Sequence, residues 1–171
     1  DALRAQLPRG ARIVVSASRR TRETAQRLVG DQFHVEPYFQ EQDFGAWTGR
    51  RHDDLLREFN EAYRRFWMRP GQEKPPGGES FADQIKRCHE GLLRLGLDGA
   101  SRDIVIVAHS GTIRAMLAIA LRLEPDAALA FMIDPWSLTR IDRVAGDWRV
   151  NFVNWIPRSF TPPAPPAAGS Q

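Results

Sequence analysis

The chain has 171 residues, of which 42% are hydrophobic, so it is long enough for one domain with a substantial core. No apolar run approaches the roughly 20 residues that a membrane-spanning helix needs, and the first residues lack the pattern of a secretory signal. The net charge is +3, but the 21 acidic residues alternate with the arginines and leave no basic stripe, which argues against a nucleic-acid partner. The single Cys88 excludes an internal disulfide and fits a cytoplasmic location.

The first elements in chain order are a strand and a helix. Residues 12–16 form a short apolar run typical of a strand, and the residues after it pass into a helix that ends at Gly30. Arg19, Arg20 and Arg22 lie where the strand passes into the helix. Because helical geometry does not let all three point the same way, we expect one or two of them to enter a site.

A second short strand, residues 33–35, precedes an aromatic segment that contains glycines and has no clean period, residues 38–49. Ordered loops of this kind often carry function. Glu41 and Asp43 are its carboxylates, and each is either a plain surface acid or a general acid. Partial burial among the bulky neighbours would suit a general acid.

Two helices follow. Apolar residues at helical spacing from Leu55 to Trp67 predict an amphipathic helix of about four turns, whose aromatic residues we interpret as core. A loop rich in proline and glycine, residues 68–78, separates it from the next helix. Ser80 and Asp83 fit a capping box at the start of that second helix, and Cys88 lies on its predicted core face.

The most informative stretch is residues 104–121. Its first part, residues 104–108, is apolar and rich in β-branched residues, which predicts a strand buried on both faces within a parallel sheet. His109, Ser110 and Gly111 then lie where the strand passes into a helix. Ligands bind at the carboxyl ends of parallel strands, and free N–H groups at a helix start suit an anion. His109 is therefore either a catalytic group or a structural residue that caps the helix or satisfies a hydrogen bond in the core.

The C-terminal part predicts an antiparallel hairpin. Residues 136–144 and 148–155 alternate apolar and polar side chains around a turn at residues 145–147. Residues 161–171, rich in proline and alanine, predict a disordered tail. The sequence thus predicts one α/β domain over residues 1–160, with three α/β/α layers, a mostly parallel sheet and this C-terminal hairpin.

Three polar groups are predicted to meet at one edge of the sheet. Arg20, Glu41 and His109 each follow a predicted strand, and the carboxyl ends of parallel strands share an edge. A guanidinium and an imidazole can neutralise charge on phosphoryl oxygens, while a carboxylic acid can protonate the leaving oxygen. This combination favours phosphoryl transfer on a small molecule.

Four motifs also occur in a fixed order along the chain. They are Ser16-Ala-Ser-Arg-Arg-Thr-Arg-Glu-Thr-Ala25, Glu41-Gln-Asp-Phe-Gly-Ala-Trp-Thr-Gly49, Gly77-Gly-Glu-Ser80 and Val107-Ala-His-Ser-Gly111. Together they resemble the histidine phosphatase (phosphoglycerate mutase-like) superfamily, and most closely its bacterial phosphatases related to α-ribazole phosphatase. The resemblance implies that Arg20 and Ser110 bind the substrate phosphate, that His109 contacts the transferring phosphoryl group and that Glu41 protonates the leaving group. It implies a phosphomonoester substrate, a phosphohistidine intermediate, and no metal or cofactor.

One family motif does not occur in the 171 residues: the Arg-His-Gly that carries the nucleophilic histidine at the end of the family's first strand. The nearest string, residues 50–53, lacks the glycine. The resemblance places that first strand mid-sheet, between the strand before His109 and the one beginning near Trp136. Unpaired central strands would cost roughly 1–3 kcal/mol per buried group, so we expect a segment of roughly 20–30 residues to precede Asp1 and to carry it. Without that segment the chain should lack phosphatase turnover.

Other functions stay open at this point. One is a non-catalytic relative that binds phosphate at Arg20 and His109 but lacks the nucleophile, and another is a phosphotransferase of the phosphoglycerate mutase type. A serine hydrolase with Ser110 as nucleophile is disfavoured, because the G-x-S-x-G elbow needs glycines where this chain has alanine and threonine. The sequence indicates neither the particular phosphomonoester nor an oligomeric state.

Overall fold

The computed structural model describes residues 2–97 and 102–161. Strand β1 (Arg12–Val15) lies between β2 (His34–Val35) and β3 (Ile104–Val107), and both pairings are parallel. The carboxyl ends of β1 and β3 therefore meet at the same edge of the sheet, with Val15 opposite Val107. The predicted parallel sheet is confirmed.

The predicted C-terminal hairpin is also confirmed. Strands β4 (Leu138–Val144) and β5 (Asp147–Trp155) pair antiparallel and form a sheet of their own in the described part of the chain. The turn residues Ala145 and Gly146 have φ of 53° and 90°, the left-handed values that a tight hairpin turn requires. Of the predicted tail, residues 162–171 lie outside the described residues.

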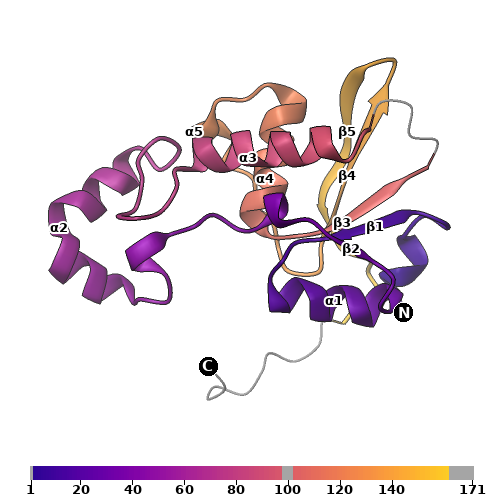
Figure 1. Cartoon of the computed structure of the whole chain (residues 1–171), viewed down its shortest axis with the longest axis horizontal. Helices are drawn as coiled ribbons and strands as arrows, with labels where there is room; N and C mark the ends of the chain where they lie inside the picture. Colours follow the sequence, from indigo (N-terminus) through magenta and orange to yellow (C-terminus); the bar gives the residue numbers. More distant parts are fainter. Residues whose placement is uncertain (1, 98–101, 162–171) are drawn as a thin grey trace.

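Helices cover both faces of the parallel sheet. The helical elements are η1 (Arg4–Gln6), α1 (Arg19–Val29), η2 (Pro37–Phe39), η3 (Gly45–Trp47), α2 (His52–Met68), α3 (Phe81–Arg94), α4 (Ser110–Leu121) and α5 (Pro125–Ala128). Helix α1 lies on one side of the sheet, while α3 and α4 pack together on the other (Figure 1). Leu95, at the end of α3, buries against Val14 of β1, with Met116 of α4 packed beside them. The three predicted layers are present.

The start of α3 has the predicted capping box. Ser80 Oγ accepts a hydrogen bond from Asp83 N at 3.1 Å, and the Asp83 carboxylate accepts one from Ser80 N at 3.2 Å. Cys88 lies on the core face of the same helix and is 0% exposed, as predicted. Burial raises the pKa of its thiol to about 12, so this cysteine is an inert core residue.

Helix α2 and η3 form an arm that projects from the sheet (Figure 1). Trp47 lies at its centre, with its ring centroid 5.2 Å from that of Tyr63 and 5.3 Å from that of Phe66. The prediction that Tyr63 and Phe66 are core residues is confirmed. Trp67, also predicted to be core, is 58% exposed. It follows Phe66 and so points about 100° away around the helix, and the arm has a packed core on one side only.

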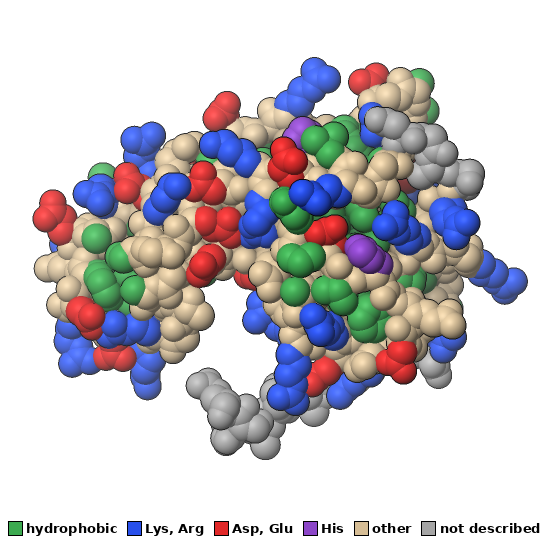
Figure 2. Space-filling model, viewed as in Figure 1, with side chains coloured by type: hydrophobic (Ala, Val, Ile, Leu, Met, Phe, Trp, Pro, Cys, Tyr) green, Lys and Arg blue, Asp and Glu red, His purple; other side chains and the backbone are tan. Residues whose placement is uncertain are grey.

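Charged side chains of both signs are interspersed over the face of the molecule drawn in Figure 2. This agrees with the interleaving of acids and arginines in the sequence. Across residues 2–97 and 102–161, each helix is too short or too polar to cross a membrane.

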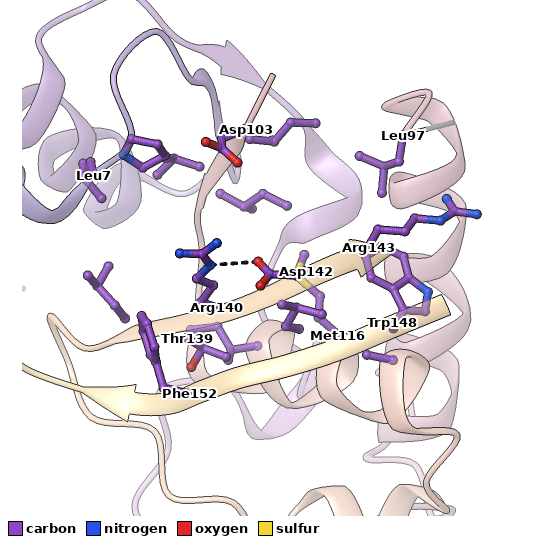
Figure 3. A pocket seen from close by; sticks show the side chains of 18 of the residues that line it. Leu7, Leu97, Asp103, Met116, Thr139, Arg140, Asp142, Arg143, Trp148 and Phe152 are labelled. Carbon is purple, nitrogen blue, oxygen red and sulfur yellow. Dashed lines mark hydrogen bonds and ion pairs between the residues drawn. The ribbon is translucent and has the colours of Figure 1, made fainter. Parts of the chain in front are cut away.

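The prediction that residues 104–108 are buried on both faces is wrong, because every residue of β3 is only half-buried. Strand β3 is the edge of its sheet, and a groove of about 1340 Å³ separates it from β4 (Figure 3). We call this hollow the β3–β4 groove. Its lining is mostly apolar and includes Ile104 and Ile106 of β3 and Met116 of α4, with Arg140 and Asp142 on β4.

Candidate active site

The site is built where β1 and β3 end. Ser16 follows β1 and His109 follows β3, and because the strands are parallel neighbours, both residues lie at the same edge. Both are buried, and Ser16 Oγ lies 2.8 Å from His109 Nε2. The bond joins residues 93 positions apart, which shows how the sheet register assembles the site.

Arg20, an exposed residue in the first turn of α1, contacts the Nδ1 edge of the His109 ring. Its Nε and Nη2 lie 3.1 Å and 2.9 Å from His109 Nδ1. Because a guanidinium can only donate, Nδ1 must accept, and the ring proton of the neutral imidazole belongs on Nε2. His109 Nε2 therefore donates to Ser16 Oγ, which can donate in turn to Thr21 Oγ1 at 2.8 Å; Thr21 donates to the Ser18 carbonyl at 2.8 Å.

The electrostatic surroundings agree with a neutral imidazole. Burial, and then the positive charge of Arg20, lower the pKa of His109 from its ordinary value of 6.5, and the Glu41 carboxylate opposes them more weakly. At neutral pH His109 is thus an N–H donor held beside a fixed cation. Its alternative role as a helix cap does not apply, since its side chain makes no capping hydrogen bond to α4.

Glu41 docks against the N-terminus of α4. Its Oε2 accepts from the backbone N–H of Gly111 at 3.3 Å and lies 3.4 Å from Ser110 Oγ. Its Oε1 accepts from Gln42 N at 3.1 Å and Gln84 Nε2 at 3.2 Å. A Cβ at position 111 would overlap Oε1 and would lie 3.1 Å from the carboxyl carbon, so this close approach requires glycine.

The loop that carries Glu41 is fastened to α3 by Arg87. Its Nη1 donates to the carbonyls of Tyr38 at 2.7 Å and Gln40 at 3.1 Å, while Nε and Nη2 pair with Glu79 at 3.1 Å and 2.5 Å. Glu79 also accepts from Asp43 N at 3.0 Å. A polar pocket of about 280 Å³ opens beside this loop; it is lined by Gln40, Glu41, Asp43, Gly77, Gly78, Glu79 and Arg87.

The structure brings the four residues singled out by the sequence into one cluster: Arg20 contacts His109, and Ser110 contacts Glu41. Their chemical roles stay predictions. Arg19 is exposed and pairs with Glu23 at 2.7 Å, so it is outside the cluster. The other candidate acid, Asp43, is exposed and accepts from Gly45 N at 2.8 Å.

Sequence reasoning missed the supporting residues Ser16, Thr21, Gln84 and Arg87. Gln84 carried a usable signal, because a polar residue on the core face of a predicted helix, three residues after Phe81, requires a buried partner. Ser16 also carried a signal, because it lies at the end of the first predicted strand, as His109 lies just after a later one. Nothing in the pattern of α3 pointed to Arg87.

The remaining histidines are placed elsewhere. His52 Nδ1 bonds the Tyr63 hydroxyl at 2.7 Å in the arm, His34 lies 3.9 Å from Glu36, and His89 is exposed. In the described part of the chain, no group of three or more His, Cys, Asp or Glu side chains could hold a metal ion.

Comparisons with known proteins place these features in context. The family model of the histidine phosphatase superfamily (branch 1) matches residues 2–156. The adenosylcobalamin/alpha-ribazole phosphatase of Escherichia coli is 27% identical over 144 residues, which are 81% of this chain and 70% of that protein. A bifunctional protein of Mycobacterium tuberculosis is 35% identical over 103 residues, 59% of this chain; the match spans only 28% of that protein. The crystal structure of the alpha-ribazole phosphatase from Shigella flexneri aligns with a TM-score of 0.80 at 24% identity, covering 90% of this chain and 79% of that one.

Proposed function

Because the chain belongs to the histidine phosphatase superfamily (branch 1), we propose that it hydrolyses small phosphomonoesters through a phosphohistidine intermediate. The observation that carries this proposal is the bidentate contact of Arg20 with His109, beside the N-terminus of α4. It places a fixed cation and an imidazole ring beside the start of a helix. Phosphoryl oxygens in a transition state are stabilised by such groups.

Each of these groups has a distinct task. The Arg20 guanidinium has five N–H donors, of which two are directed at His109, so the others can bind phosphoryl oxygens. The hydroxyl of Ser110 and the positive end of the α4 dipole add to this anion site. We assign His109, buried beside Arg20, to the contact with the transferring phosphoryl group.

Glu41 would act as acid and then as base. In the first step a nucleophilic histidine nitrogen bonds to phosphorus while the bond to the ester oxygen breaks, and protonated Glu41 gives its proton to that oxygen. In the second step Glu41 takes a proton from water as the water oxygen attacks phosphorus, which releases phosphate and frees the histidine. Glu41 ends the cycle protonated, so protons and electron pairs balance.

We place the nucleophilic histidine on a strand upstream of Asp1 that occupies the β3–β4 groove. Arg12 N donates to the carbonyl of Asp103 at 2.9 Å and Ser16 N to that of Val107 at 3.1 Å, so these β3 carbonyls face β1. The backbone groups of Ile104 and Ile106 then face the groove, because successive residues of a strand point opposite ways. A parallel strand there would join the two sheets and end beside His109.

The test uses the full-length protein with its upstream segment and a panel of phosphomonoesters. We expect turnover, an acid-labile, alkali-stable phosphoprotein during turnover, and losses of at least about a hundredfold in kcat for Arg20→Ala and His109→Ala. The chain from Asp1 onward should be inactive. Near-wild-type rates in either variant would reject the assignment.

Two other results would redirect the proposal. Transfer of the phosphoryl group to a second hydroxyl of the substrate, rather than to water, would indicate a mutase. Binding of inorganic phosphate without turnover, in a full-length protein lacking an upstream Arg-His-Gly, would indicate a non-catalytic phosphate-binding relative. The similarity to a named phosphatase along 81% of this chain supports hydrolysis.

A further inference from the structure

We propose that Gln84 is a positioning residue for the Glu41 carboxyl, whose side-chain amide holds that carboxyl in both its ionised and its protonated form. This inference rests on the proposed function, in which Glu41 alternates between acid and base. Gln84 lies on α3 and is 0% exposed. Its Nε2 donates to Glu41 Oε1 at 3.2 Å and to the Gln40 carbonyl at 3.3 Å.

The other end of the amide is unusual. Gln84 Oε1 is buried and has no hydrogen-bond partner among the residues that the structure describes. A buried acceptor left in this state costs about 1–3 kcal/mol, so its retention next to a candidate catalytic acid requires a reason. The Gln84 Oε1 atom lies close to the start of α4, since a Cβ at Gly111 would be 3.0 Å from it.

The reason lies in what the Glu41 carboxyl needs in each state. The ionised form needs donors, which the N–H groups of Gly111 and Gln42 supply. These backbone N–H groups only donate, so they cannot accept a hydrogen bond from a protonated carboxyl. Among the described side chains that contact this carboxyl, two can accept a hydrogen bond from it. They are Gln84, through its amide oxygen, and Ser110, whose hydroxyl lies 3.4 Å from Oε2.

A half-turn of the Gln84 amide about its last bond exchanges the positions of its oxygen and nitrogen. The oxygen then lies about where Nε2 was, 3.2 Å from Glu41 Oε1, where it can accept a hydrogen bond from the O–H of the neutral carboxyl. The Gln40 carbonyl loses one donor but keeps Arg87 Nη1 and Thr112 Oγ1, both at 3.1 Å. The unpartnered oxygen is thus the acceptor held ready for the protonated state.

The first test is the leaving-group dependence of kcat/KM in the full-length protein. Gln84→Met keeps a similar volume but removes both donor and acceptor, and Gln26→Met, at an exposed glutamine of α1, is the matched control. An alkyl phosphate needs a proton on its leaving oxygen, whereas 2,4-dinitrophenyl phosphate does not. We expect Gln84→Met to lose at least about tenfold on the alkyl ester and less than about threefold on the dinitrophenyl ester. An equal loss on both esters, or no loss on either, would overturn the proposal.

A second test does not depend on turnover. If the wild-type protein hydrolyses neither ester, the proposed function fails, and NMR of the ¹⁵N-labelled protein still decides the role of Gln84. Its side-chain amide protons should move as Glu41 takes up its proton and should stay fixed in Glu41→Gln. That variant is needed because His109 and Arg87 also interact with Glu41. Chemical shifts of the Gln84 side-chain amide that stay the same in the wild type when Glu41 becomes protonated would refute the inference.

Discussion

Replacing Gly111 by alanine should separate activity from stability. The added Cβ would overlap Glu41 Oε1, and restoring an ordinary contact of 3.4 Å or more moves the carboxylate by about 1 Å. Misplacing a catalytic group by about 1 Å costs about a hundredfold in rate, and we expect that loss in kcat/KM. The backbone of α4 gains at most about 1 kcal/mol from the same change, the preference for alanine over glycine in a helix interior, because position 111 lies in the first turn. The melting temperature should therefore change by only a few degrees.

The assay for Gly111→Ala is hydrolysis of an alkyl phosphate by the full-length protein, with thermal unfolding in parallel. Gly71→Ala is the control, because its Cβ would meet Pro125 Cβ and Asp126 Oδ1 at 2.8 Å and touches neither Glu41 nor the loop that carries it. It should lose stability while the folded fraction keeps its kinetics. A Gly111→Ala enzyme with wild-type kcat/KM would show that the observed position of Glu41 is irrelevant to catalysis.

Three further predictions concern titration and stability. Burial lowers the pKa of His109 below 6.5, so the unfolded chain binds more protons than the folded chain at acid pH, and the free energy of unfolding falls as the pH drops from 6.5. In urea unfolding at several pH values, His109→Asn should make this fall less steep. An unchanged slope in the variant would contradict the prediction. Ser80→Ala removes the cap that accepts from Asp83 N and should cost about 1 kcal/mol of unfolding free energy, with no measurable cost counting against the capping box. Cys88, 0% exposed and with its pKa raised to about 12, should react with a thiol reagent at pH 8 only after unfolding in guanidinium; rapid labelling of the native protein would disprove its burial.

Local patterns were the reliable part of the sequence analysis. The capping box of Ser80 and Asp83, the turn at Ala145 and Gly146, and the strand before His109 each depend on residues close together in the chain. Such features follow from backbone preferences that act over a few residues. The fold class followed from their order.

Features that join distant segments were harder to foresee. The prediction that β3 is buried on both faces was wrong, because its burial depends on what lies beside it in the sheet. The β3–β4 groove borders β3 on the side away from β1, so its residues are only half-buried. The contacts of Gln84 and Arg87 with the Glu41 loop span more than forty residues and follow no sequence period. Arg20 and His109 were foreseen as neighbours because the carboxyl ends of parallel strands share an edge.

The two sides of the β3–β4 groove differ in how they resist association between molecules. Strand β4 lines the groove with Arg140, Asp142 and Arg143, charges of the kind that discourage a foreign strand from adding to an edge. Strand β3 has only the uncharged residues Ile-Val-Ile-Val, 104–107, and so lacks such charges along its edge. A folding intermediate in which β3 has formed while its free edge is still unpaired is therefore prone to aggregate, so the yield of refolding should fall as the protein concentration rises. Val105→Lys would place a charge on that edge and should reduce aggregation during folding.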